Sequence, residues 1–419
     1  MLLNKKIKSN ILSKTVDEDD RKIGIEVECF IYNKDFKRIP VNQASEYSAS
    51  DLLSELNKNI NNNGYFSLEP GGQVEWSSPP YRDIKDLEIS LLSYKRLLDK
   101  ILKKRGLRSL YIGVDPFYDP ENIDLISQKK YQLMNKNMEK KDILGKWMMR
   151  NTSSIQINYD IVDEKDLEEI MFIADCIHPV SSYLFSNSPF KLGKSTGEFN
   201  LRNHIWENTD KDRCRTLFDH KIKHPNNLLH NYIAFMYEVP GIFQLDDELE
   251  IRGTDLKLGE ILKNRLKKNK LRDEDIQIAL HQIFTNVRLK SLIEVRDFDC
   301  LPFKYILAPV SFFTGLIGDN FIRKKLIKKF VSWTDKERFL WNQNASSLEI
   351  DKIGPQNRKF IDWIEWVGDI AIEGLKRRDN NEIKYFLGFY KNILKNGPLG
   401  LQKQKNFISS KLSLEKFIF

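Results

Sequence analysis

Apolar and polar residues alternate along four separate stretches of the chain: Gly24–Glu28, Leu68–Trp76, Ser154–Asn158 and Val287–Arg296. Successive side chains of a β-strand point to opposite faces, so each stretch predicts a strand with one apolar and one polar face. In the first stretch Glu26 and Glu28 share a face, while Ile25 and Val27 take the other. The same spacing groups further polar residues: Gln73 with Glu75, Gln156 with Asn158, and Glu294 with Arg296. The pattern predicts a sheet whose polar face collects acids and amides.

Helical periodicity dominates much of the remaining chain, with apolar residues three or four positions apart. One more strand is expected at Leu107–Val114, and helices are expected at Ser50–Asn59, Leu87–Lys104, Asp166–Phe185, Leu258–Leu266, Asp273–Phe284, Lys304–Ile317 and Asp351–Arg377. Residues 1–20 are polar and charged, which favours an N-terminal tail or capping segment. Because strands and helices do not alternate regularly, the order favours an α+β fold with an antiparallel or mixed sheet and a helical C-terminal region.

Composition and charge narrow the class of protein. Of 419 residues 41% are hydrophobic, and 67 Lys and Arg against 59 acids give a formal net charge of +8. These values favour a globular protein with a solvated, lysine-rich surface and no nucleic-acid partner. The four cysteines form no CxxC pair, which favours reduced thiols. With no signal sequence and no run of about 18 apolar residues, we expect a cytoplasmic location and no membrane partner. The oligomeric state is not indicated.

Two patterns imitate well-known sites without meeting their physical requirements. The segment Ser188–Thr196 approaches the phosphate-binding loop GxxxxGK[ST], but it lacks the first glycine, and Pro189 removes a backbone N–H that such a loop needs. His220 and His224 have the i, i+4 spacing of a zinc pair, but no HExxH motif is present and Pro225 interrupts the helix. Neither a P-loop nor a zinc site is expected.

The acids on the predicted strands are too many for an ordinary solvent-facing sheet surface. Gly71 and Gly72 allow a close approach of the backbone beside Glu69 and Glu75. The last stretch interleaves cations with its acid on the polar face: Arg288, Lys290, Glu294 and Arg296. Such a mixture suits a phosphate held partly by metal and partly by guanidinium groups. Oxygen ligands without Cys or His select Mg²⁺ or Mn²⁺ over zinc, so the residues predict a metal–nucleotide site.

The motifs, taken in order from residue 24 to about 300, resemble the glutamate–cysteine ligases of the plant and proteobacterial type. The resemblance rests on Gly24–Glu28, Ser67–Glu75, Thr152–Asn158, Phe185–Phe190, Arg202–Arg213 and Val287–Arg296. The most specific of these is Leu-Glu-Pro-Gly-Gly-Gln at residues 68–73, whereas the last 100 or so residues match only in being helical. The resemblance implies a glutamine-synthetase-like catalytic fold, in which a curved, largely antiparallel sheet forms a bowl for Mg²⁺, ATP and glutamate.

The resemblance also implies roles for individual residues. Metal-facing positions are Glu26, Glu28, Glu69, Glu75, Gln156 and Glu294. Arg296 is similar to the arginine near the transferred phosphoryl group, and together with Glu294 it is assigned to catalysis. Binding of ATP or substrate is assigned to Arg202, Arg213, Arg288, Lys290, Asn158 and Trp206. The catalytic carboxylate–amine ligase domain is placed at residues 21–340, with residues 341–419 packed on it.

Departures from the family pattern bear on the acceptor amine. Asn151–Gln156 and Phe298–Cys300 differ from the usual residues, which leaves the metal and phosphoryl machinery intact. The expected reaction is ATP-dependent joining of the glutamate γ-carboxylate to the amine of L-cysteine through a γ-glutamyl phosphate. Two alternatives stay open: a ligase of the same fold that uses another amine, and a catalytically silent or nucleic-acid-binding protein. The segment Asn187–Gly197 is a candidate cover for the site.

Overall fold

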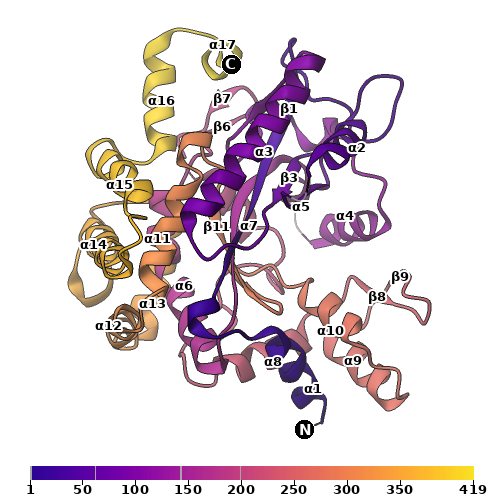
Figure 1. Cartoon of the computed structure of the whole chain (residues 1–419), viewed down its shortest axis with the longest axis vertical. Helices are drawn as coiled ribbons and strands as arrows, with labels where there is room; N and C mark the ends of the chain where they lie inside the picture. The colour runs from indigo at the N-terminus through magenta and orange to yellow at the C-terminus, as the bar shows by residue number, and fades with distance from the viewer. Residues whose placement is uncertain (1, 62, 142–143, 199) are drawn as a thin grey trace.

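A seven-stranded sheet organises the chain (Figure 1). The computed structural model describes residues 2–419 except residues 62, 142–143 and 199. The strands follow the order β10-β11-β5-β1-β3-β2, with β4 paired to the end of β1, and every pairing in the sheet is antiparallel. Their bounds are β1 Ile23–Asn33, β2 Tyr65–Leu68, β3 Val74–Ser77, β4 Leu107–Leu110, β5 Ser154–Tyr159, β10 Val287–Leu289 and β11 Ile293–Asp299. The α+β prediction with an antiparallel sheet is confirmed.

The register of the strands gathers the predicted polar residues on one face of the sheet. Glu28 lies opposite Glu75, and Glu26 lies opposite Gln156. Glu294 lies opposite both Asn158 on β5 and Arg288 on β10. The intervening side chains on the other face are fully buried: Val27, Val74, Ile155 and Val295. The alternation read from the sequence therefore places the acids as predicted.

Long helices cover the apolar face of the sheet. α3 (Ile84–Arg105) stacks Tyr94 on Trp76 of β3, with ring centroids 4.7 Å apart. α11 (Leu307–Ile317) packs Phe313 on Phe298 of β11, and α6 (Glu164–Leu184) packs along β10 and β11. α14 and α15 pack in turn on α11. This support leaves the polar face of the sheet free to line a site.

The remaining elements surround the sheet (Figure 1). They are α1 Leu2–Ile11, α2 Ala49–Asn59, α4 Lys129–Lys141, α5 Gly145–Asn151, α7 Leu201–Glu207, α8 Leu228–Glu238, α9 Leu258–Lys267, α10 Asp273–Leu280, α12 Asn320–Phe330, α13 Asp335–Ser347, α14 Phe360–Arg378, α15 Lys384–Asn396, α16 Leu399–Ser410 and α17 Leu414–Ile418, with the hairpins β6 Phe190–Lys191 with β7 Lys194–Ser195 and β8 Phe243–Leu245 with β9 Ile251–Gly253. The expected helices at residues 351–377 and 304–317 begin later, at Phe360 and Leu307. The expected strand at residues 107–114 ends at Leu110. The domain division at residue 340 stays a prediction.

The misleading sequence patterns have ordinary structures. The P-loop-like segment forms the β6–β7 hairpin, which turns at Leu192 and Gly193 with φ of 51° and 76°. His220 makes its hydrogen bond through Nε2 to the carbonyl of Cys214, at 2.6 Å. The four cysteines are free and buried. Within the described residues no single helix is long and apolar enough to span a membrane; residues 303–317 and α12 pass only as a pair bent by 84°, and α11 is wholly buried.

Candidate active site

The polar face of the sheet opens into a cavity of about 460 Å³, which we name the acidic compartment. Its carboxylates come from β1, β3 and the turn before β3: Glu26, Glu28, Glu69 and Glu75. Glu28 and Glu75 are only 6% and 8% exposed. Cations line the same cavity: Lys130, Arg202, Arg288, Lys290 and Arg296. The compartment therefore holds both signs of charge, as a metal-bound polyphosphate requires.

The glycine pair in the most specific motif shapes the turn that carries Glu69. Gly72 has φ of +77°, and its N–H donates to the carbonyl of Glu69. At Gly71 a Cβ atom would lie 2.4 Å from the carbonyl oxygen of Arg150, so only glycine fits there. Gln73 also lines the cavity, but both ends of its amide bind backbone: Oε1 accepts from the N–H of Gly71, and Nε2 donates to the carbonyl of Thr152 just before β5.

Three of the four acids have a pKa that burial and a neighbouring carboxylate raise more than the nearby cations lower it. Burial, together with the charge of Glu75, raises the pKa of Glu28 to about 7. Burial and the charge of Glu28 raise the pKa of Glu69 to about 7 as well. The pKa of Glu75 lies well above its ordinary value because of burial and the charge of Glu26. Divalent cations would neutralise such a group of acids.

These acids can supply oxygen ligands to a metal ion, but they do not form a complete coordination shell by themselves. Across the residues that the structure describes, no three His, Cys, Asp or Glu side chains are placed to hold a metal ion by themselves. Mg²⁺ normally keeps several waters and takes one or two carboxylates plus the phosphates of the substrate. Oxygen donors without thiol or imidazole fit that preference, so the donor set is compatible with Mg²⁺ or Mn²⁺.

Glu294 is the centre of a dense ion-pair network on the cationic side. It accepts from Arg288 through both oxygens, at 2.7 and 2.8 Å, and it pairs with Lys290 at 2.8 Å and Arg296 at 2.6 Å. Burial alone would raise its pKa, but the three cations hold that pKa well below the ordinary range. To bind a metal ion, Glu294 would have to release one of these three cationic side chains. Its predicted metal role stays a prediction.

A β-bulge aims Arg296 into the site. The register of β11 with β5 shifts between Val295 and Phe298, so that Arg296 and Asp297 together stand opposite one residue of β5, Gln156. The Nη1 atom of Arg296 donates to Gln156 Oε1 and to Glu294 Oε1, both at 2.6 Å. This pair of contacts fixes the guanidinium at the border between the carboxylates and the cations.

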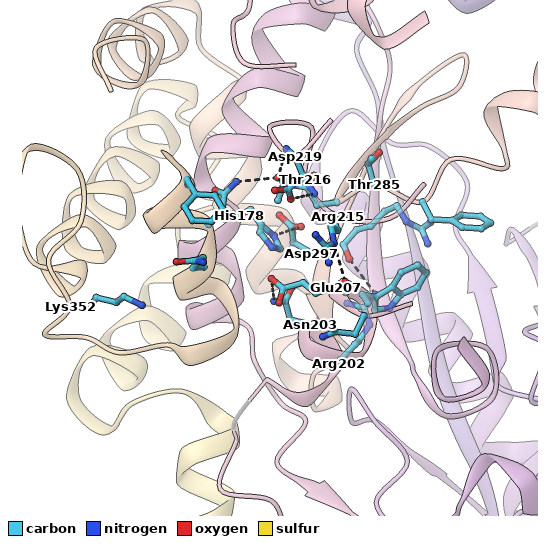
Figure 2. Close-up of a pocket in the computed structure, with 18 residues that line it drawn as sticks. His178, Arg202, Asn203, Glu207, Arg215, Thr216, Asp219, Thr285, Asp297 and Lys352 are labelled. Carbon is cyan, nitrogen blue, oxygen red and sulfur yellow. Dashed lines mark hydrogen bonds and ion pairs between the residues drawn. The ribbon is translucent and has the colours of Figure 1, made fainter. Parts of the chain in front are cut away.

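A second cavity of about 550 Å³, the polar compartment, adjoins the first. Both cavities are lined by Arg202, Trp206, Phe284 and Arg296. The guanidinium groups of Arg202 and Arg296 lie 5.7 and 5.5 Å from the Trp206 ring centre, so these side chains form the shared wall. Beyond it lie His178, Asn203, Glu207, Arg215, Thr216, Asp219, Asn286, Asp297, Phe339 and Asn342 (Figure 2).

One buried ion pair marks the polar compartment. His178 Nδ1 lies 2.8 Å from Asp297 Oδ1, and Figure 2 shows the two side chains together in the middle of the pocket. Burial would lower the pKa of His178, but Asp297 raises it above the ordinary value. Burial raises the pKa of Asp297, against the charge of His178. A protonated imidazole beside a carboxylate is the arrangement that these opposing effects favour.

Two predicted binding residues, Arg213 and Asn158, lie outside the lining of both compartments. Arg213 is fully buried and lines neither compartment. Its guanidinium binds Asp210 and the carbonyls of Gln282 and Pro240, so its contacts here are structural, and its role in substrate binding stays a prediction. Asn158 donates to Glu26 at 3.0 Å and lies outside the lining of both cavities.

The candidate cover at Asn187–Gly197 packs elsewhere in this structure. No residue of the segment 187–197 lines either compartment among the residues that the structure describes. Phe190 of that segment instead packs against Phe407 and Phe417 near the C-terminus. The hairpin is therefore fixed by packing away from the site.

Several lining residues were not found from the sequence. Lys130 and Tyr131 come from α4, and His281 follows α10; none stands in a strand pattern. Burial and the positive charge of Arg288 lower the pKa of His281 to about 3, so its imidazole is neutral. Beyond the shared wall with Arg202, Trp206 and Arg296, the polar compartment was not predicted, because most of its residues come from helices and loops.

Comparison with known proteins agrees with this geometry. Residues 22–411 match Glutamate-cysteine ligase family 2 (GCS2). The chain is 28% identical over 337 residues to the chloroplastic glutamate–cysteine ligase of Medicago truncatula, covering 79% of this chain and 65% of that protein. It is 28% identical over 343 residues to the Arabidopsis thaliana protein of the same name, covering 80% and 64%. The chain thus spans slightly less than two thirds of the length of these relatives.

A solved structure shares the fold. The glutamate–cysteine ligase of Francisella tularensis, crystallised in complex with AMP, aligns with a TM-score of 0.52 at 11% identity, covering 96% of this chain and 98% of that one. At that identity the likeness concerns the fold alone. The family match extends over most of the chain and includes every strand of the acidic compartment. The chain therefore belongs to glutamate-cysteine ligase family 2.

Proposed function

We propose that this protein uses ATP to join the γ-carboxylate of glutamate to the amine of L-cysteine, giving γ-glutamylcysteine, ADP and phosphate. The family and the names of the plant relatives support this reaction. The AMP complex of the Francisella protein supports the use of an adenine nucleotide. The chain shares a family with the plant enzymes and a fold with the Francisella enzyme, and the proposal assigns the complete ligase reaction to it.

One observation carries the proposal: four carboxylates, of which Glu28 and Glu75 are buried, face a group of cations across a single cavity. Acids are costly to bury, and the nearby cations do not offset what burial and neighbouring carboxylates do to the pKa of Glu28 and Glu69. A protein that only needed a stable sheet would have apolar or solvated residues there. A divalent cation and a polyphosphate would neutralise both halves of the cavity at once.

The residues suit transfer of a phosphoryl group between two anions. A carboxylate oxygen of glutamate attacks the γ-phosphorus of ATP, the bond to the β-phosphate oxygen breaks, and ADP leaves. Gln156 and Glu294 hold the Arg296 guanidinium at the edge of the carboxylates, and from there it would stabilise the negative charge that builds on the transferred group. Mg²⁺ or Mn²⁺, held by Glu26, Glu28, Glu69 and Glu75, would neutralise the phosphate oxygens.

The second half of the reaction needs a nucleophile and an enclosed site. The amine of the acceptor attacks the carbonyl carbon of the γ-glutamyl phosphate, the C–O bond to phosphate breaks, and the amine gives up a proton. The side of the acidic compartment beside Glu69 is largely apolar, lined by Pro70, Tyr131, Met134, Met148 and Met149. Such a surface suits a small side chain such as that of cysteine and keeps water from the acyl phosphate.

The test is ADP release with ATP, Mg²⁺ and glutamate, in the presence and absence of cysteine, with the product identified by mass spectrometry. We expect turnover that depends on cysteine and yields γ-glutamylcysteine. Turnover with another amine in place of cysteine would support the alternative ligase of the same fold. No Mg²⁺-dependent turnover with any of a panel of amines would overturn the proposal.

A further inference from the structure

A separate cavity of about 370 Å³, which we name the rear cavity, lies on the helix-covered face of the sheet. Ile23 of β1 and Tyr159 of β5 line it, and these two residues lie opposite each other in the sheet. Both stand on the apolar parity of their strands, so they face away from the acidic compartment. The other walls come from the segment before β1, the loop before α3, the end of α11 and the end of α14. Because Asn158, the residue before Tyr159, donates to Glu26, a ligand in the rear cavity would lie directly behind the acidic compartment.

Arg21 gives the rear cavity a buried donor that nothing in the chain satisfies. Its side chain is 10% exposed, and its Nη2 pairs with Asp166 Oδ1. Its Nε is buried and has no hydrogen-bond partner among the residues that the structure describes. Buried polar groups in folded proteins are nearly always paired, so this N–H calls for an acceptor from outside the chain.

Further donors line the same cavity. Arg378 is 22% exposed and uses its Nε to donate to Glu382, at 2.8 Å. The hydroxyls of Tyr159 and Thr314 lie 3.2 Å apart and share one hydrogen bond, so one of their two protons is left to donate. Burial raises the pKa of Tyr159 while the charges of Arg378 and Arg21 act against that rise, which places both guanidinium groups near its hydroxyl. These donors together select a ligand group that only accepts, such as a carboxylate or a phosphate.

The charges around these donors favour a carboxylate over a phosphate. Arg21 already pairs with Asp166, and Arg378 already pairs with Glu382, so each guanidinium has a buried carboxylate beside it. Two more negative charges on one phosphate would meet these carboxylates at close range and repel them. A single negative charge spread over two oxygens accepts from both arginines with less repulsion.

Acids at the exposed edge of the rear cavity favour a positive group on the same ligand. Glu18 and Asp19 line the cavity and are both exposed. The exposed Arg82 also lines it, but its guanidinium pairs with Asp20. A ligand with a carboxylate towards the buried donors and an ammonium group towards these acids matches both parts of the lining.

We propose that the rear cavity is a second binding site, and that it takes a small zwitterionic amino acid. The carboxylate of the ligand accepts from Arg21 Nε and from the guanidinium of Arg378, and the ammonium group lies beside Glu18 and Asp19. This inference goes beyond the proposed ligase reaction, because no residue of the rear cavity lines the acidic or the polar compartment.

The test is calorimetry on the metal-free protein without ATP, with L-alanine, L-leucine, β-alanine and γ-aminobutyrate as probes and inorganic phosphate for comparison. We expect at least one of the amino acids to bind about tenfold or more tightly than phosphate. Analogues of the tightest binder that lack either the amino group or the carboxylate should bind about tenfold more weakly. If none of the four amino acids binds, if phosphate binds more tightly than all of them, or if the carboxylate is dispensable, the assignment is overturned.

Variants assign the binding to the two ends of the ligand. Arg21→Met should weaken the amino acid about tenfold or more, and Lys22→Met, an exposed neighbour outside the lining, should bind like the wild type. Asp19→Asn changes only the exposed edge, so it guards against a folding defect. It should weaken the amino acid about threefold and leave the analogue without an amino group unaffected. Thermal melting shows that each variant is folded, and unchanged affinity in both Arg21→Met and Asp19→Asn would overturn the proposal.

A variant of the acidic compartment separates the two sites. Arg296→Met should keep the wild-type affinity for the amino acid, because Arg296 does not line the rear cavity. An amino acid whose binding is weakened by Arg296→Met and unaffected by Arg21→Met would sit in the acidic compartment, and the rear site would be refuted. Because binding is measured without ATP, the result holds whether or not the protein shows ligase turnover.

Discussion

Replacing Arg296 by methionine removes one charged donor from the border between the two halves of the acidic compartment. Two hydrogen bonds disappear, to Gln156 and Glu294, each 2.6 Å long in the wild type. Removing one donor that stabilises developing charge typically costs about 3–4 kcal/mol of transition-state stabilisation, or roughly 10²–10³ in kcat. Because the other cations of the cavity remain, we expect the KM for ATP to change by less than about tenfold.

The effect on folding is separable from the effect on catalysis. Glu294 keeps Arg288 and Lys290 as partners in this variant, so its charge is not left unpaired. The loss of hydrogen bonds to charged groups should lower the free energy of unfolding by about 1.5–3 kcal/mol. Steady-state ADP release gives kcat and KM, and urea unfolding gives stability. Arg105→Met, on the exposed end of α3, is the matched control. A kcat within about threefold of the wild type would refute the role of Arg296.

Three further predictions concern charged side chains: Glu75 lowers the stability of the metal-free protein, whereas His178 and Arg213 raise stability through their ion pairs. Glu75→Gln relieves repulsion and burial of charge, so the metal-free protein should melt at a higher temperature while Mg²⁺-dependent turnover falls by about 10² or more; a lower melting temperature would contradict the charge argument. The pKa of His178 is raised in the folded protein, so its ion pair stabilises the fold fully below the ordinary pKa of about 6.5. That contribution is lost as the pH rises through the higher pKa of the folded state. The free energy of unfolding of the wild type should therefore fall over that pH window. His178→Gln should flatten this dependence in urea titrations, and an unchanged slope would count against the pair. Arg213→Met should lower the free energy of unfolding by about 3–5 kcal/mol with kcat per folded molecule unchanged; a selective loss of kcat would restore its binding role.

The part of the site that strands supply was predictable from the sequence, because the alternation of side chains along a strand is a local property. Knowing that Glu26 and Glu28 share a face needs only their spacing, and the register of the sheet then brought Glu75 and Glu294 to that face. The glycine pair at residues 71–72 likewise predicted a close approach of the backbone, and Gly71 makes such an approach to Arg150.

The part of the site that helices and loops supply was not predictable. Arg202 and Arg213 stand in one motif, yet Arg202 faces the cavities while Arg213 turns to the carbonyls of Gln282 and Pro240. The two carbonyls that bind Arg213 lie 69 and 27 residues away along the chain, and no local pattern encodes such contacts. In the sequence Asn342 resembles any polar residue of a helix, and only the fold brings Thr216 and Asp219 near it.

The central claim is that the carboxylates of the acidic compartment bind divalent ions attached to ATP. The most direct measurement is anomalous scattering from Mn²⁺ in crystals grown with a non-hydrolysable ATP analogue and glutamate. The prediction is manganese peaks about 2.1 Å from carboxylate oxygens of Glu26, Glu28 or Glu75, with the γ-phosphate near Arg296. An ordered nucleotide with manganese bound elsewhere, and these carboxylates touching no ion, would contradict the claim.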